Sequence, residues 1–119
     1  MGSEMCIRDR DVLAHKVQVL RRHCADAGRD PAEVEVTQLS NVLAASDGAD
    51  LKTRIGWLNH GLSPEQFVER TMAATVDEHI DRFSRVAAAG VDRVIVSLAD
   101  VGTDGAVENF AAIIDHFRP

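Results

Sequence analysis

Residues 75–98, TVDEHIDRFSRVAAAGVDRVIVSL, limit the folds open to this chain more than any other segment. A capping box formed by Thr75 and Glu78 predicts the start of a helix, and Gly90 is placed where a helix ends. An apolar strand is predicted directly afterwards, over residues 91–98. A helix that passes through a short turn into an apolar strand is the unit from which parallel sheets are built.

The N-terminal third of the chain repeats this unit once. Apolar residues at helical spacing predict a helix over residues 11–27, with Gly28 at its end. Its expected apolar stripe is Leu13, Val17, Leu20, Cys24 and Ala27. The segment Asp30 to Glu33 predicts one short capped turn, and residues 34–43 are typical of a buried strand that SDGAD ends.

Three helices are expected between the two strands, and one after the second strand. The first of these helices carries Leu51, Ile55 and Leu58 and ends at Gly61. The next starts at Ser63 with a proline and a capping glutamine, and its inward residues are Phe67, Thr71 and Met72. The third has the inner stripe Ile80, Phe83 and Ala87. In the last helix, capped by Asp104, we expect Val107, Phe110, Ala111, Ile114 and Phe117 to face inward.

The predicted fold class is α/β, with two parallel strands and covering helices. Two strands cannot satisfy the edges of a buried parallel sheet, because backbone groups at both edges would lack partners. A (β/α)8 barrel needs about 250 residues, about twice this chain of 119. We therefore expect residues 11–119 to be the C-terminal portion of a (β/α)8 barrel, the remaining strands lying upstream.

Residues 1–10, MGSEMCIRDR, follow no helical or strand period. The string SEMCIRDR resembles a translated sequencing adapter, so we interpret residues 1–10 as a non-native segment and give Cys6 no role. The alternative interpretation is an ordinary frayed N-terminus. Either way, these residues are left out of the fold prediction.

Composition excludes several classes of protein. A formal charge of −6 and an aromatic content of 4% disfavour a nucleic-acid surface. No apolar run is long enough to span a membrane, and no signal peptide is evident. The two cysteines form no CxxC motif, so a cytoplasmic location is the simplest expectation.

Three segments resemble the C-terminal part of luciferase-like oxidoreductases: HKVQVLRRHCADAGRDPAEVEVT, TVDEHIDRFSRVAAAGVDRVIVSL and VENFAAIIDHFRP. The likeness is strongest to the actinobacterial group that uses the deazaflavin coenzyme F-420, and it covers nearly all of residues 11–119. It implies a (β/α)8 barrel that transfers hydride between a small organic substrate and F-420, with FMN as the second choice of cofactor. Some members of the family are monooxygenases.

The resemblance carries no catalytic residue over to this chain, because the family's main cofactor contacts and proton-transfer residues lie on earlier strands. Where many members have alanine-glycine-threonine, this chain has Ala73-Ala74-Thr75, which leaves the local backbone geometry open while Thr75 keeps the cap. The resemblance thus implies a cofactor held mainly by the missing N-terminal part and an inactive fragment. A homodimer is one arrangement open to the parent.

Candidate site residues follow from position alone. Active-site groups of a barrel lie at the C-terminal ends of its strands. Four polar residues at these ends are candidates for the rim of a substrate site: Gln38, Ser40, Ser97 and Asp100. The alternative is ordinary hydrogen bonding where a strand enters a loop.

No metal site is expected, because the five histidines show no ligand spacing, and they are interpreted as surface or boundary residues. Cys24 is interpreted as a small core residue, since no base accompanies it. Two other functions stay open. One is a metal-dependent hydrolase on the same barrel, which would need carboxylate or histidine ligands at both strand ends. The other is a self-contained α/β binding or dimerisation module without catalysis.

Overall fold

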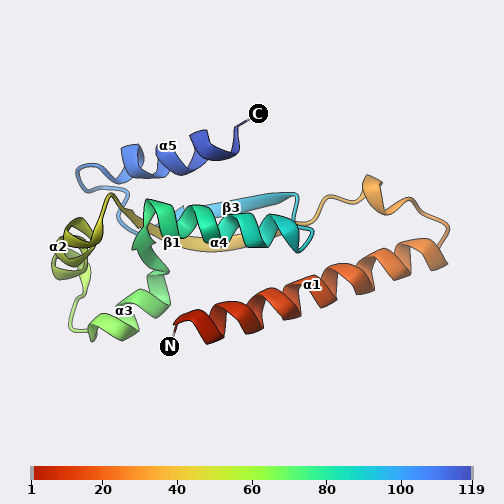
Figure 1. Cartoon of the computed structure of the whole chain (residues 1–119), viewed down its shortest axis with the longest axis horizontal. Helices are drawn as coiled ribbons and strands as arrows, with labels where there is room; N and C mark the ends of the chain where they lie inside the picture. Colours follow the sequence, from red (N-terminus) through yellow and green to blue (C-terminus); the bar gives the residue numbers. More distant parts are fainter. Residues whose placement is uncertain (1, 119) are drawn as a thin grey trace. The chain divides into compact units, whose positions relative to one another are not determined.

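The computed structural model describes the backbone of residues 2–118 and the side chains of residues 11–118. Its elements (Figure 1) are α1 (Gly2–Asp26), η1 (Pro31–Glu33), β1 (Thr37–Ala45), α2 (Gly48–Leu58), α3 (Pro64–Thr71), β2 (Ala73–Thr75), α4 (Val76–Ala88), β3 (Arg93–Leu98) and α5 (Ala106–Phe117). The chain divides into two compact units. The first unit holds the described residues up to Leu39 together with Phe83–Ile95, and the second holds Ser40–Arg82 together with the described residues from Val96.

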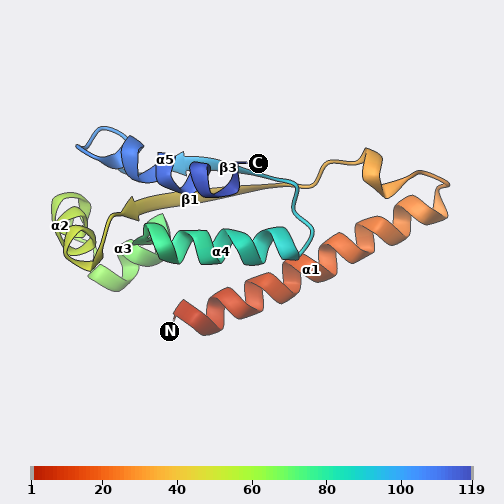
Figure 2. The ribbon, with the colours of Figure 1, turned by 45° about the horizontal axis from the view of Figure 1, so that its top comes forward.

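The fold is mixed α/β, with a small parallel sheet in the order β2-β1-β3. Figure 2 shows β1 and β3 side by side. The amide of Arg93 donates to the carbonyl of Val36, and the amide of Ala99 donates to that of Val42. Both bonds advance along the two strands together, so β1 and β3 run parallel. The expected α/β class is confirmed.

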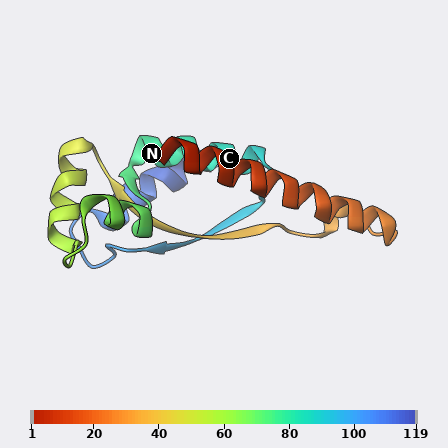
Figure 3. The same ribbon diagram turned by 90° about the horizontal axis from the view of Figure 1, so that it is seen from below.

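A third strand, β2, corrects the prediction of two. It pairs with the last residues of β1, Leu43 opposite Ala73 and Ala45 opposite Thr75. Alanine has little strand propensity, so this strand is formed by its pairing and burial and not by its sequence. Figure 3 shows α2 and α3 beside one another, and both pack on β2 in the second unit.

The core of the second unit surrounds three buried residues, Leu43, Phe67 and Ala73. Partly buried side chains from α2 and from the loop before α3 pack against them: Leu51, Ile55, Leu58 and Leu62. The inward stripe expected for α2 is therefore confirmed. Burial of these apolar groups holds α2 and α3 against the end of β1.

In the first unit, α1 begins at Gly2. The sequence analysis predicted a start at residue 11, so the observed helix is longer at its N-terminal end. No proline interrupts residues 3–10, and their propensities allow the helix to continue. The side chains of this segment, Cys6 included, lie outside the described residues. Val17 and Cys24 are buried as expected, but Leu20 and Ala27 are exposed, so the apolar stripe of α1 is narrower than predicted.

The predicted caps are confirmed in four places. Gly28 has a positive φ of 72° after α1, and Asp30 caps η1 by accepting from the amide of Ala32. Ser63 and Gln66 form the full capping box of α3, and Thr75 and Glu78 form that of α4. These motifs act over three residues, which is why sequence alone predicts them.

The last helix departs from prediction in both its cap and its buried face. Its N-cap is Gly105, with a φ of 82° and no side-chain hydrogen bond, so the cap assigned to Asp104 is wrong. Ala106 and Ile113 are buried instead of the expected stripe. Among the five residues predicted to face inward, Phe110 is half-buried, and four are exposed: Val107, Ala111, Ile114 and Phe117.

The inner stripe of α4 is also rotated from prediction. Phe83 is buried and Ile80 is half-buried, as expected, but Ala87 is exposed. His79 and Val86 are buried on this helix. His79 is almost fully buried in the second unit, so its assignment to the surface or to the boundary of the core is wrong.

Candidate functional site

The structure separates the four residues predicted for the rim. Side-chain exposure alternates along β3 and along β1 as far as Val42, as the pleat of a strand requires, and the last four residues of β1 are all buried. Ser97 lies on the exposed side of β3, whereas Gln38 and Ser40 lie on the less exposed side of β1. Asp100 lies beyond β3 and is buried. A role for these residues in substrate contact stays a prediction.

Gln38 and Ser40 have different surroundings. The Oε1 atom of Gln38 is buried and has no hydrogen-bond partner among the described atoms. The hydroxyl of Ser40 accepts from Nη1 of Arg82 at 3.0 Å and donates to the carbonyl of Asn41 at 3.2 Å. Ser40 therefore contributes to the contact between β1 and α4 within the second unit.

Asp100 is held by Arg54, a buried arginine of α2. Nη1 of Arg54 lies 3.0 Å from Oδ2 of Asp100, and both side chains are almost fully buried. The same Nη1 donates to the hydroxyl of Thr103 at 2.8 Å, and Nη2 donates to the carbonyl of Asp104. Arg54 thus connects α2 to the loop that follows β3, at the C-terminal ends of two adjacent strands.

Asp50 completes this cluster from the first turn of α2. Its Oδ2 accepts from Nε of Arg54 at 2.9 Å and from the amide of Ser46 at 2.9 Å. Asn109 of α5 donates to the carbonyl of Ala44 at 3.0 Å and lies 3.4 Å from the same carboxylate oxygen. One set of polar contacts therefore joins the end of β1, α2 and α5. We call Asp50, Arg54, Asp100, Thr103 and Asn109 the arginine cluster.

Electrostatics in this cluster favour the charged forms. Desolvation opposes ionisation of Asp50, but the amide of Ser46 and the guanidinium of Arg54 outweigh it and lower the pKa of Asp50. Desolvation likewise opposes the charge on Arg54, but Asp50 and Asp100 outweigh it and raise the pKa of the guanidinium. Arg54 and Asp50 therefore stay charged near neutral pH.

The arginine cluster is suited to hold the loop after β3 in position against α2. The Nε, Nη1 and Nη2 atoms of Arg54 each donate to an oxygen inside the protein. A guanidinium occupied in this way is not available to a phosphate or carboxylate group of a ligand. Arg54, the cation that α2 places at these strand ends, is therefore not suited to bind the anionic part of a nucleotide-like cofactor.

His79 forms a second buried polar contact in the same unit. Its side chain is 1% exposed, and Nε2 lies 2.9 Å from the carbonyl of Leu43. A carbonyl only accepts, so Nε2 carries the proton and Nδ1 accepts from Nη2 of Arg82 at 3.2 Å. Desolvation, with a smaller contribution from Arg82, lowers the pKa of His79, although the Leu43 carbonyl acts in the opposite direction. A neutral imidazole therefore links α4 to β1.

The exposed side of β1 and β3 carries both apolar and polar residues. The backbone bonds at Val36 and Val42 place Leu39 beside Ile95, and Asn41 beside Ser97. Leu39 is 75% exposed and Ile95 is 51% exposed. Asn41 donates to the carbonyl of Arg70 at 3.2 Å, and it precedes the buried end of β1. Asn41 and Ser97 are the polar side chains that this face offers near the strand ends.

Three of these residues were missed by the sequence analysis. Arg54 falls on the predicted stripe of Leu51, Ile55 and Leu58, and a charged residue on an apolar stripe is a signal of a buried ion pair. His79 precedes Phe83 by one helical turn, and the same argument applies to it. Asn41 has no comparable signal, because its position depends on strand register.

Among the described side chains, those of residues 11–118, no group of three or more His, Cys, Asp or Glu is close enough to hold a metal ion. No helix among residues 2–118 is long and apolar enough to cross a membrane. The single cysteine with a described side chain, Cys24, is buried and not in a disulfide, which confirms its place in the core.

Comparisons with protein-family models, with curated proteins and with solved structures each find no match to this chain. The likeness to luciferase-like oxidoreductases therefore rests on the sequence segments quoted above.

Proposed function

We propose that residues 11–119 are the C-terminal part of a (β/α)8 oxidoreductase of the luciferase-like type. The whole enzyme would transfer hydride between a small organic substrate and the deazaflavin F-420, with FMN as the alternative cofactor. Some members of that family also activate oxygen, so a monooxygenase is included in the proposal. This chain would supply the two long adjacent strands β1 and β3, the short strand β2, their helices and part of the rim around the substrate.

The exposed pair Leu39 and Ile95 is the observation that carries this proposal. Parallel sheets are normally covered on both faces, because their connections place helices on the sheet. Here two large aliphatic side chains lie next to each other on an exposed face of a parallel pair of strands. Inside a barrel, inward-facing aliphatic side chains of all the strands fill the interior in layers, each layer drawn from alternate strands. The pair is therefore suited to the interior of a closed barrel.

The edge of β1 supports the same proposal. Strand β2 pairs only with Leu43 to Ala45 of β1. Along the same edge of β1, no strand among the described residues pairs with Thr37 to Val42. An open edge of this kind exposes backbone donors and acceptors that another strand could pair with. In a barrel, the preceding parallel strand would occupy this edge.

The residues of this chain would have limited roles in the enzyme. Asn41 and Ser97 are suited to hydrogen bond a substrate or the edge of a cofactor ring, since both lie on the face that a barrel would enclose. The arginine cluster would hold the strand ends that carry them. The deazaflavin would supply the hydride-accepting carbon when bound, and strands upstream of this chain would hold its anionic part.

Titration with cofactor tests the proposal. The chain alone should bind F-420 and FMN only weakly, with a Kd of about 1 mM or higher, because a sheet of three strands cannot enclose a pocket. Cofactor fluorescence should report micromolar binding after the upstream part of the barrel is added. Saturable micromolar binding by the chain alone, as a monomer, would contradict the fragment proposal.

A self-contained α/β binding or dimerisation module is the second candidate. The second unit supports it. The charged groups of its arginine cluster pair with one another, and its apolar core at Leu43, Phe67 and Ala73 is buried within the same unit. A monomer that melts cooperatively without any upstream part would favour this candidate. Aggregation or loss of fixed tertiary packing would favour the fragment.

A further inference from the structure

The chain contains two aspartate–glycine pairs, Asp47-Gly48 and Asp104-Gly105. In such a pair the amide nitrogen of the glycine can attack the side-chain carboxyl carbon of the aspartate, because glycine has no Cβ to block the approach. Both aspartates are exposed in the second unit, and each lies just before a helix. A serine precedes the first pair and a threonine the second, so a large difference in their reactivity must come from the fold.

The carboxylate of Asp47 is held by the helix that follows it. Its Oδ1 accepts from the amide of Asp50 at 2.8 Å, as the N-cap of α2. This bond must break before the carboxyl carbon can turn to the nitrogen of Gly48. A side-chain cap contributes about 1 kcal/mol, which corresponds to a rate about fivefold slower.

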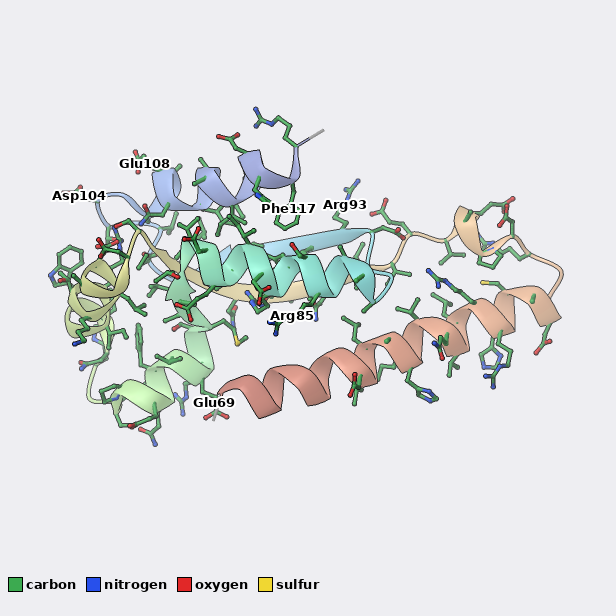
Figure 4. All side chains as sticks on the ribbon, in the orientation of Figure 1. Glu69, Arg85, Arg93, Asp104, Glu108 and Phe117 are labelled. Carbon is green, nitrogen blue, oxygen red and sulfur yellow. The ribbon has the colours of Figure 1, made fainter. Side chains whose placement is uncertain are left out.

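The carboxylate of Asp104 is free to turn. Among the described atoms, its side chain has no hydrogen-bond or ion-pair partner, and it does not cap α5. Figure 4 labels Asp104 at the turn before this helix. Its main-chain carbonyl, in contrast, is fixed because it accepts from Nη2 of Arg54. The main chain at Asp104 is therefore held while its side chain is not.

The arginine cluster also requires the glycine that follows. Gly105 has a φ of 82°, which other residues adopt only with strain. A Cβ at this position would lie 2.8 Å from Nη2 of Arg54, whose side chain is almost fully buried. The contact that fixes Arg54 thus selects the residue that leaves Asp104 open to attack.

We propose that Asp104 is a site of spontaneous isomerisation to isoaspartate, and that this change loosens the turn that holds Arg54. The nitrogen of Gly105 bonds to Cγ of Asp104, a Cγ–O bond breaks, and one water leaves as a cyclic imide forms. Water then adds at the former main-chain carbonyl carbon, and the bond from that carbon to nitrogen breaks. The water lost is regained, so no other reactant is needed.

Isomerisation alters the turn in two ways. The main chain from Asp104 to Gly105 then runs through Cβ and Cγ, so it gains one atom. The hydrogen bond from the amide of Ala106 to the carbonyl of Thr103, at 3.4 Å, spans these two residues and cannot keep its length. The carbonyl that accepts from Arg54 becomes a carboxylate, beside a guanidinium that two aspartates already neutralise. This inference goes beyond the proposed function and does not depend on it.

Prolonged incubation of the full chain at neutral pH tests the first part. Peptide mapping, with labelling by an isoaspartyl methyltransferase, measures isoaspartate at each pair. In native buffer Asp104 should convert about fivefold faster than Asp47, and in concentrated urea the two rates should become similar because the cap is lost. Equal rates in native buffer, or a ratio that urea does not change, would overturn the inference.

Asp104→Glu tests the second part. Glutamate keeps the charge, but its longer side chain would need a larger ring, so it should not isomerise at a comparable rate. After the same incubation, the wild-type chain should unfold at a lower urea concentration than before, whereas Asp104→Glu should keep its initial midpoint. An equal loss in both chains, or an unchanged midpoint in wild type rich in isoaspartate at position 104, would contradict the effect on the turn that holds Arg54.

Discussion

Nη1 of Arg54 and Oδ2 of Asp100 lie 3.0 Å apart, with both side chains buried in the second unit. The two residues come from α2 and from the loop after β3, so one ion pair fixes the position of a loop relative to a helix distant in sequence. Removing one partner of a buried pair leaves the other charge without compensation, which costs more than the pair itself contributes.

Arg54→Met should therefore lower the free energy of unfolding by about 3 kcal/mol or more, because Asp100 loses its guanidinium. The matched control is Arg29→Met. Arg29 pairs with Glu33 at 3.9 Å, with both side chains more than half exposed, and its loss should cost less than about 0.5 kcal/mol. Urea unfolding measures both values. Equal effects of the two substitutions would mean that the buried pair does not stabilise the fold.

Stability should fall on mild acidification because of His79. Its folded pKa lies below 6.5, the value expected in the unfolded chain. The stabilisation is fully present above pH 6.5. It is lost as the pH falls from there toward the folded pKa, because only the unfolded chain takes up the proton. Asp50 has a lowered pKa too, but its effect begins only below 3.8. The two windows therefore begin at different pH values, 6.5 for His79 and 3.8 for Asp50.

His79→Gln is the variant for this prediction. Glutamine keeps a donor for the Leu43 carbonyl but does not titrate. Chemical unfolding at several pH values between 7 and 5 should show a smaller slope than wild type, at a lower overall stability. His15→Gln, on the exposed side of α1, is the control and should keep the wild-type slope. An unchanged slope in His79→Gln would show that another group is responsible.

Substitution of glycine by alanine should change the stability of the chain in opposite directions at two positions. Gly90 has a φ of 107°, and a Cβ there would lie 2.7 Å from Cγ1 of Val17. Gly90→Ala should therefore destabilise the chain by about 1–3 kcal/mol. Gly56 lies within α2 with no atom near such a Cβ, so Gly56→Ala should stabilise by about 0.5–1 kcal/mol. Thermal unfolding compares the two. A stabilised Gly90→Ala variant would contradict the close packing of α1 at this turn.

Deletion of residues 1–10 should leave the free energy of unfolding unchanged within about 1 kcal/mol. The buried residues of α1 with described side chains are Val17 and Cys24, well after the deleted segment. The remaining helix still holds both. Urea unfolding of the shortened chain provides the measurement, and a larger loss would mean that this segment packs on the protein.

Sequence alone predicted the features that depend on neighbouring residues. The capping boxes at Ser63 and Thr75 and the turn at Asp30 need only side chains three residues apart. The two long strands were also found, because runs of apolar residues lie between clear turn signals. Their bounds shifted by a few residues, since the ends of a strand depend on its partners.

Features set by pairing across the fold escaped prediction. Ala73 to Thr75 became a strand because Leu43 to Ala45 offered an edge, which alanine propensity does not indicate. The buried face of α5 was misplaced because its apolar residues span a wide sector of the helix, and the buried Ala106 and Ile113 lie at one edge of that sector, which periodicity does not indicate. The partner of Arg54 is another such case, because the helix stripe identifies the residue but not Asp100.

The DNA upstream of Asp11, read from an independent assembly, tests the central claim most directly. The claim is that the parallel strands of this chain belong to a larger closed barrel, as the exposed pair Leu39 and Ile95 suggests. We predict an in-frame coding region that supplies about six further strand–helix units in place of residues 1–10. A stop codon directly upstream of a native start would contradict the account and favour the self-contained module.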